Sequence, residues 1–226
     1  GFYHDTDMIK VITGVRRCGK SSLMKTIIEE LKEQDIAEQN IILLDLDSKR
    51  YKDIRETEQL EREIEQYDDV QGMKYLFIDE IQNVNGFEKV INAYRGEGDY
   101  SIFITGSNSY LLSGELITKL TGRYIEFEIL PLSFEEYIKM KEFYQKEVST
   151  NLSEELDKFL NDGGFPKAIF YDNPEDKRIY IKSVIKEIFE KDIKRRVKIR
   201  NVSVFEKIQT YLINNFGATT SLTSMM

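Results

Sequence analysis

One loop near the N-terminus constrains the fold of this chain more than any other segment. Residues 14–21, GVRRCGKS, fit the pattern of glycine, four residues and Gly-Lys-Ser that is typical of a phosphate-binding loop. An apolar, β-branched segment at 9–13 comes directly before the loop, and apolar residues at helical spacing come after it. The sequence therefore predicts a strand, a tight glycine loop and an amphipathic helix in direct succession.

The loop also predicts how a nucleotide is held. Its glycines let successive backbone N–H groups turn toward a phosphate, and the following helix adds the positive end of its dipole. Lys20 would reach the β and γ phosphates of ATP, and the Ser21 hydroxyl would bind Mg²⁺. A plain glycine turn with a surface lysine is the alternative interpretation. We expect ATP or ADP to contact the whole loop and the next residue, namely Gly14, Val15, Arg16, Arg17, Cys18, Gly19, Lys20, Ser21 and Ser22.

Three side chains of the loop each have two interpretations. A helix N-terminus and two neighbouring arginines lower the pKa of a thiol, which suggests a redox role for Cys18, the single cysteine. A small residue that the loop merely tolerates is the favoured interpretation. Arg16 and Arg17 either add positive charge beside a bound anion or point outward.

A pair of carboxylates ends another apolar segment. Residues 75–78 are apolar or aromatic and lead into Asp79 and Glu80. At a strand end beside the loop, Asp79 would hold Mg²⁺ through water, and Glu80 would polarise the water that attacks the γ-phosphate. Such a pair alone is most often a solvated turn, so the prediction depends on the loop as well.

Strands alternate with helical patterns over the first 130 residues. This alternation predicts an α/β fold, the three-layer sandwich of P-loop NTPases with a parallel five-stranded sheet and ligands at the carboxyl ends of its strands. The expected strands are 9–13, 41–46, 75–79, 102–105 and 124–129.

From Pro131 onward the pattern is helical. Helix start signals are Ser133 with Glu136, Asn173 before a proline, and Ser203 with Glu206. The sequence predicts a core at 1–130, a lid-like helical region at 131–200 and the truncated start of a C-terminal domain at 201–226.

Two further places are candidates for contact with the γ-phosphate. Ser107 or Asn108 would sense it if their strand lies between the first and the third, although a turn that caps the next helix is the other interpretation. Arg123 precedes the last strand and would reach the γ-phosphate of a neighbouring copy, or form a structural ion pair.

Charge is distributed unevenly along the chain. The net charge is −8, yet residues 177–200 hold ten Lys or Arg against three acidic residues. This basic stretch predicts a solvated helix face against an acidic protein surface or, as the second choice, contact with DNA. Because no apolar run approaches about 18 residues and no signal-peptide pattern is present, we expect no membrane contact and a cytoplasmic location.

Six motifs occur in order along the chain: ITGVRRCGKS (12–21), LFIDEIQ (76–82), ITGSNS (104–109), LTGR (120–123), LPLSFEEY (130–137) and GGFP (163–166). With these motifs the chain resembles a prokaryotic family of AAA-type P-loop ATPases whose core precedes a C-terminal domain of unknown function. The resemblance implies phosphate and Mg²⁺ binding at Gly14 to Ser21 and Asp79, water activation at Glu80, and a sensor near Ser107 and Asn108. It implies the role of Arg123 toward a neighbouring copy less directly.

Three functions are consistent with these motifs. The leading one is Mg²⁺-dependent ATP hydrolysis with Lys20, Glu80 and Arg123 as catalytic residues, coupled to movement of the helical region and open to assembly with further copies. The second is a nucleotide-dependent switch with little turnover that recruits DNA or a protein through 177–200 or the missing C-terminal domain. The third is a small-molecule kinase, which Glu80 beside Asp79 argues against.

Overall fold

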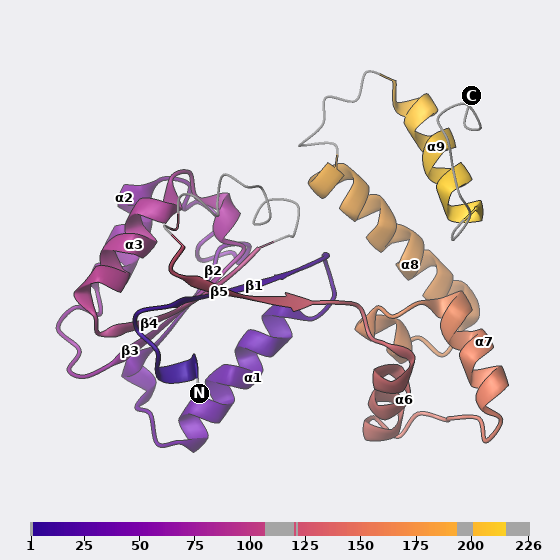
Figure 1. Cartoon of the computed structure of the whole chain (residues 1–226), viewed down its shortest axis with the longest axis horizontal. Coiled ribbons are helices and arrows are strands. Elements are labelled where there is room, and N and C mark those ends of the chain that lie inside the picture. The colour runs from indigo at the N-terminus through magenta and orange to yellow at the C-terminus, as the bar shows by residue number, and fades with distance from the viewer. Residues whose placement is uncertain (1, 107–119, 121, 194–200, 216–226) are drawn as a thin grey trace.

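A five-stranded parallel sheet forms the centre of the N-terminal part of the molecule in the computed structural model, which describes residues 2–106, 120, 122–193 and 201–215 (Figure 1). The strand order is β2-β3-β4-β1-β5, and each strand lies close to its predicted segment. The strands are β1 Ile9–Gly14, β2 Ile41–Asp45, β3 Lys74–Asp79, β4 Tyr100–Thr105 and β5 Tyr124–Ile129.

The strand register brings distant segments to one edge of the sheet. β4 lies between β1 and β3, with Ile12 opposite Thr105 and Ile78 opposite Ile104. Because all of these strands run in the same direction, the loop after β1 and the acidic residues at the end of β3 meet at the same carboxyl edge.

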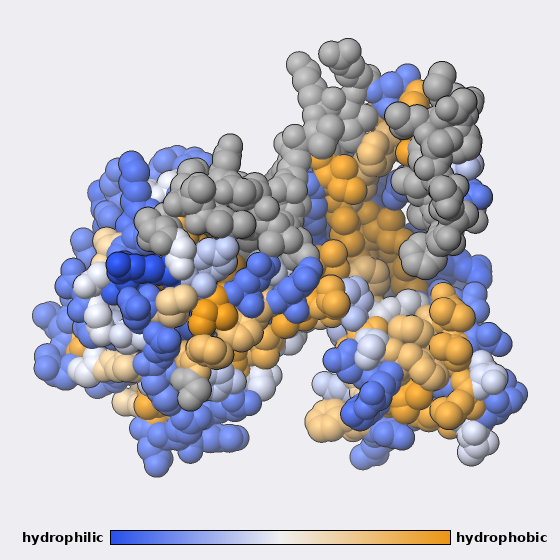
Figure 2. Space-filling model, viewed as in Figure 1, coloured by the Kyte–Doolittle hydropathy of each residue, from blue (hydrophilic) through white to orange (hydrophobic). Residues whose placement is uncertain are grey.

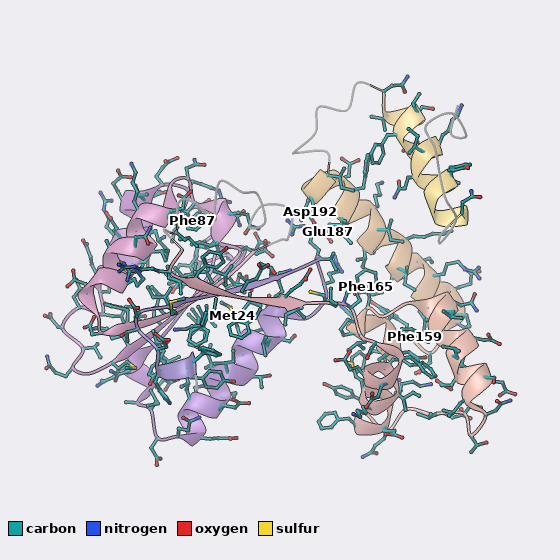
Figure 3. All side chains as sticks on the ribbon, viewed as in Figure 1. Met24, Phe87, Phe159, Phe165, Glu187 and Asp192 are labelled. Atoms are coloured by element: carbon teal, nitrogen blue, oxygen red, sulfur yellow. The ribbon has the colours of Figure 1, made fainter. Side chains whose placement is uncertain are left out.

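Helices cover both faces of the sheet (Figure 1). Helix α1 (Lys20–Glu33) covers one face, and α2 (Thr57–Glu65) and α3 (Phe87–Glu97) cover the other. Figure 3 shows Met24 and Phe87 on opposite sides of the sheet, and both are buried. Alternate residues along each strand point to the two faces, which gives the sheet a hydrophobic layer on each side. The predicted three-layer sandwich is confirmed.

The chain after β5 is helical, as predicted. The helices are α6 Phe134–Phe143, α7 Leu152–Asp162, α8 Pro174–Ile188 with a π-helical turn at Phe189–Ile193, and α9 Val202–Asn214. Short 3₁₀ turns lie at Phe2–His4, Glu38–Asn40, Ile81–Asn83 and Pro166–Phe170.

Two of the three predicted helix starts are confirmed. Ser133 forms a capping box with Glu136, and the Asn173 side chain accepts a hydrogen bond from the N–H of Glu175. The prediction that Ser203 caps the last helix is wrong. Asn201 caps α9 instead and accepts from the N–H of Val204 at 3.1 Å.

The helical region has a small core of its own. Tyr180 and Val184 of α8 pack against Ala168, while Phe159 of α7 packs against Tyr137 of α6. Glu155, which is fully buried, is paired with Lys141, so a charge interaction also joins α6 to α7. Figure 2 shows apolar side chains gathered over this part of the molecule.

The described residues include no helix that is long and apolar enough to cross a membrane.

The turn after α7 is closely packed. Gly164 accepts a hydrogen bond from the N–H of Leu132 at 2.7 Å, and a Cβ on this glycine would lie 2.3 Å from the Leu132 carbonyl oxygen. The second glycine of the GGFP motif therefore lets the turn contact the segment that leaves the sheet.

The stacked aromatic pair under α1 tests the packing of the sheet. Phe77 is fully buried, and its ring lies 4.6 Å from that of Phe103. We expect Phe77→Ala to lower the free energy of unfolding by about 3–5 kcal/mol, measured by urea denaturation. Leu43→Ala, at a residue that is 38% exposed, is the control and should lower the free energy of unfolding far less. Equal losses in the two variants would contradict this packing.

Candidate nucleotide-binding site

The loop after β1 turns back on itself around a lysine. Gly14 has a φ of 146°, and a Cβ there would lie 2.3 Å from the carbonyl oxygen of Ile129, so only glycine fits. Lys20 is 4% exposed, and its Nζ donates hydrogen bonds to the carbonyl oxygens of Gly14 (3.0 Å) and Val15 (3.1 Å). The ammonium therefore lies at the centre of the loop and is held by the loop's own backbone.

The first turn of α1 opens beside this ammonium. Gly19 precedes the helix with a φ of 117°, and no side chain of the described residues caps it. The first N–H groups of a helix lack partners within the helix, and its dipole makes this end positive. Ser21 and Ser22 are exposed in the same turn. The geometry suits an anion that approaches between the loop and the helix.

Two acidic residues lie across from the loop at the end of β3. Asp79 is 7% exposed, and its Oδ1 accepts a hydrogen bond from the Thr105 hydroxyl. Glu80 follows in the left-handed region with a φ of 58°, and its N–H donates to Thr105 Oγ1 at 3.0 Å. From the sequence, Thr105 is one of the small polar residues that end the strand between the loop strand and the acidic strand, and the sensor role falls to Ser107 or Asn108. The contacts of Thr105 with both acidic residues were not predicted.

The Glu80 side chain faces the loop. Its Oε2 lies 3.9 Å from a guanidinium nitrogen of Arg16 and accepts a hydrogen bond from Gln82. Burial raises the pKa of Glu80, although the charges of Arg16 and Lys20 oppose the shift. A carboxylate with a raised pKa is a better proton acceptor than an ordinary glutamate.

The oxygen donors at this edge suit Mg²⁺ together with a nucleotide. Ser21 supplies a hydroxyl at the helix start, and Asp79 supplies a carboxylate at the end of β3. Among the described residues, no group of three or more His, Cys, Asp or Glu side chains is placed to hold a metal ion. Mg²⁺ commonly takes one or two protein oxygens, several waters and the phosphates of its substrate, so this sparse donor set fits it.

Both arginines of the loop contact the helical region. Arg16 Nε donates to Asp192 Oδ1 at 3.0 Å, and Arg17 donates two hydrogen bonds to Glu187 Oε2, at 3.0 and 2.7 Å. Figure 3 shows Glu187 and Asp192 on the part of the helix nearest the end of β1. Hydrogen bonds from Lys191 and Arg17 lower the pKa of Glu187, which keeps it charged. Two of the three acidic residues of the basic stretch 177–200, Glu187 and Asp192, thus face the loop.

A pocket of about 450 Å³ lies between the sheet and the helical region. Its core side is polar and charged, and its helical side is largely apolar. The lining residues are Arg16, Arg17, Gly19, Lys20, Ser21, Ser22 and Glu80 from the core and Met140, Tyr144, Pro166, Lys167, Phe170, Tyr180 and Glu187 from the helical region.

Cys18 does not have the environment of a reactive thiol. The side chain is 4% exposed, and burial raises its pKa despite the nearby charge of Lys20. This supports the interpretation of Cys18 as a small residue that the loop tolerates.

The other expected contacts lie elsewhere. Ser107 and Asn108 lie outside the described residues. Arg123 precedes β5 at the opposite edge of the sheet, where its carbonyl accepts from the N–H of Ile9 and its exposed side chain lies 4.0 Å from Asp7. The structure therefore does not bring Arg123 to the loop of its own chain, and its trans role stays a prediction.

Curated relatives at more than 30% identity are uncharacterized. One protein of Haemophilus influenzae is 38% identical over 95% of this chain and 53% of its own length. Another, of Methanocaldococcus jannaschii, is 36% identical over 92% of this chain and 47% of its own length. The chain thus spans about half the length of these relatives.

Two solved structures have a partly similar chain path. A Caenorhabditis elegans PCH-2 structure is 18% identical with a TM-score of 0.48, covering 81% of this chain and 62% of its own. A DNA polymerase III gamma subunit-related protein of Thermotoga maritima is 12% identical with a TM-score of 0.43, covering 89% and 62%.

Two family matches together cover nearly the whole chain. A domain of unknown function, DUF8612, matches residues 153–226. The AAA domain matches residues 6–138, which include the phosphate-binding loop, the acidic pair and the whole sheet. This match extends over more than half of the sequence and agrees with the parallel sheet and the loop geometry, so the chain belongs to the AAA domain family.

Proposed function

We propose that this chain binds ATP with Mg²⁺ and hydrolyses it. The observation that carries the proposal is the meeting of the Lys20 loop and the acidic pair Asp79 and Glu80 at one edge of the sheet, beside a pocket large enough for a nucleotide. A phosphate site alone would support binding, whereas an adjacent, partly buried carboxylate with a raised pKa supports water activation.

Each polar group has a distinct role in this proposal. Lys20 exchanges the carbonyls of Gly14 and Val15 for oxygens of the β and γ phosphates, so it stabilises charge that builds up in the transition state. Ser21 and Asp79 would hold Mg²⁺, which would neutralise phosphate charge when bound. Glu80 takes a proton from the attacking water.

The base of the nucleotide would lie toward the helical region. Met140, Tyr144, Pro166 and Phe170 give that side of the pocket apolar and aromatic surface. The Tyr144 and Phe170 rings lie 4.7 Å apart and are 46% and 42% exposed, so they offer flat surface to a purine. Bound nucleotide would then contact both parts of the molecule.

The loop arginines supply a physical basis for movement of the helical region. Glu187 and Asp192 neutralise Arg17 and Arg16, and a polyphosphate entering the pocket competes for the same guanidinium groups. Binding of ATP would therefore loosen the contact between α8 and the loop, and release of phosphate would restore it. We propose this competition as the coupling between the nucleotide and residues 131–200.

One observation favours a switch with slow turnover as the second candidate. The Glu80 carboxylate is already engaged by Gln82 and lies close to Arg16, so it must leave these partners to act on water. In that case DNA or a protein would be recruited in one nucleotide state, through 177–200 or a further C-terminal domain. The division at residues 130 and 200, assembly with further copies and a cytoplasmic location remain part of the proposal.

Two substitutions separate binding from hydrolysis. We expect Lys20→Ala to weaken ATP binding at least about tenfold, because it removes the charge at the centre of the loop. Glu80→Gln should keep binding within a few-fold and lower the rate of phosphate release by about 10²-fold or more. Calorimetry and a phosphate-release assay measure the two quantities.

The exposed Glu33 at the far end of α1 offers a charge-matched control, and Glu33→Gln should change neither quantity. Wild-type turnover in Glu80→Gln would rule out water activation by Glu80. A wild-type chain that binds no nucleotide with Mg²⁺ present would contradict the proposed function as a whole.

The double variant Glu187→Gln with Asp192→Asn tests the coupling. Removing the internal competitors should tighten ATP binding by about 3–10-fold, which corresponds to about 1 kcal/mol. By reciprocity, ATP should increase hydrogen exchange of residues 174–193 in the wild type and change it little in the variant. Glu175→Gln with Asp176→Asn removes the same charge at the other end of α8 and should behave as the wild type. Unchanged or weaker ATP binding in the first variant would contradict the competition.

A further inference from the structure

A single buried hydroxyl connects the two acidic residues of the site. Thr105 is the last residue of β4 and is fully buried. Its Oγ1 donates a hydrogen bond to Asp79 Oδ1 and accepts one from the N–H of Glu80 at 3.0 Å. One side chain from a neighbouring strand therefore contacts both residues to which the proposed reaction assigns a role.

The direction of these two hydrogen bonds is fixed by chemistry. A threonine hydroxyl has one hydrogen to donate, and the backbone N–H of Glu80 is a donor only. The Thr105 hydrogen must therefore go to Asp79, which acts as acceptor through Oδ1. This arrangement holds one carboxylate oxygen inside the sheet and sets the orientation of the other.

The contact to Glu80 also stabilises an unusual backbone. Glu80 has a φ of 58°, a left-handed conformation that residues with a Cβ seldom adopt. This conformation turns the chain sharply at the end of β3, and the Glu80 side chain then faces Arg16 and the loop. The hydroxyl of Thr105 anchors the N–H at this turn, so it contributes to the direction of the Glu80 side chain.

The strand register explains why this position suits such a role. Thr105 lies opposite Ile12 of β1, and the next residue, Gly106, donates its N–H to the Ile12 carbonyl at 3.3 Å. The end of β4 is therefore bonded to the loop strand through its backbone and to the acidic pair through a side chain. These contacts help to set the distance between the loop after β1 and the acidic pair at the end of β3.

We infer that Thr105 is a positioning residue for hydrolysis, one that orients Asp79 toward the metal and Glu80 toward water without touching either substrate. This inference rests on the proposed function. Loss of the hydroxyl from a purely structural threonine would lower stability alone. Its loss from a positioning threonine would change kcat and the Mg²⁺ concentration for half-maximal rate more than the affinity for ATP.

Two substitutions at this position separate the hydroxyl from the packing. Thr105→Val keeps the shape and loses the hydroxyl, and we expect kcat to fall at least about tenfold while the KM for ATP changes less than about threefold. The Mg²⁺ concentration for half-maximal rate should rise several-fold. Thr105→Ser restores the hydroxyl and should recover kcat to within about threefold of the wild type.

A buried hydroxyl on the same strand is the control. Ser101 is fully buried and binds Lys10 and the Tyr3 carbonyl near the other end of β4. Ser101→Ala should lower thermal stability and leave both kcat and the Mg²⁺ concentration for half-maximal rate unchanged. If Thr105→Val does not fold, Thr105→Ala removes the same hydroxyl without filling the space and should show the same kinetic changes.

The outcomes distinguish this inference from the proposed function. If a folded Thr105→Val or Thr105→Ala variant kept the wild-type kcat and the wild-type Mg²⁺ concentration for half-maximal rate, the inference would be overturned. The proposed hydrolysis would still stand. Equal losses of kcat in Thr105→Ser and Ser101→Ala would also overturn the inference, because they would reflect weakened packing. A wild-type chain that releases no phosphate would refute the proposed function and the inference together.

Discussion

The parallel pairing of β4 with β1 on one side and β3 on the other is the interaction on which the site depends. Backbone hydrogen bonds set this register, and the apolar residues of alternate faces hold it between α1 and the pair α2 and α3. Lys20 and Glu80 are 60 residues apart in the sequence, yet each follows the carboxyl end of its strand by a few residues. A slip in register would separate them, since the position of each is set by the end of its strand.

The second organising feature is the set of ion pairs and hydrogen bonds that the loop cations form around the pocket. Lys20 is held by loop carbonyls, Arg16 by Asp192 and Arg17 by Glu187, so the cations of the loop all have partners in this conformation. A buried cation without a partner would be costly, and the contacts of Lys20 and Arg16, which are 4% and 13% exposed, remove that cost. They also mean that an incoming polyphosphate replaces existing interactions, and its net affinity is the difference between two sets of contacts.

Much of the fold followed from local sequence, because apolar β-branched segments and a glycine loop have few structural alternatives. The three-layer arrangement and the edge that carries the ligand follow from the rules for parallel sheets. The contacts of Arg16 and Arg17 did not, since Asp192 and Glu187 lie 176 and 170 positions away and no local pattern links them. Thr105 was hidden in a run of small polar residues. The start of α9 was misplaced because Asn201 and Ser203 are both good caps, and only the backbone conformation decides between them.

Helix α8 links the pocket mechanically to more distant parts of the chain. Tyr180 near its middle and Glu187 near its end both line the pocket, and the π-helical turn carries Phe189, whose ring stacks on Phe205 of α9 at 4.8 Å. Glu187, which binds the loop, and Phe189, which stacks on α9, are therefore two residues apart at the same end of α8. In the proposed cycle, a shift of this end when nucleotide binds would act on α9 directly through the stacked rings.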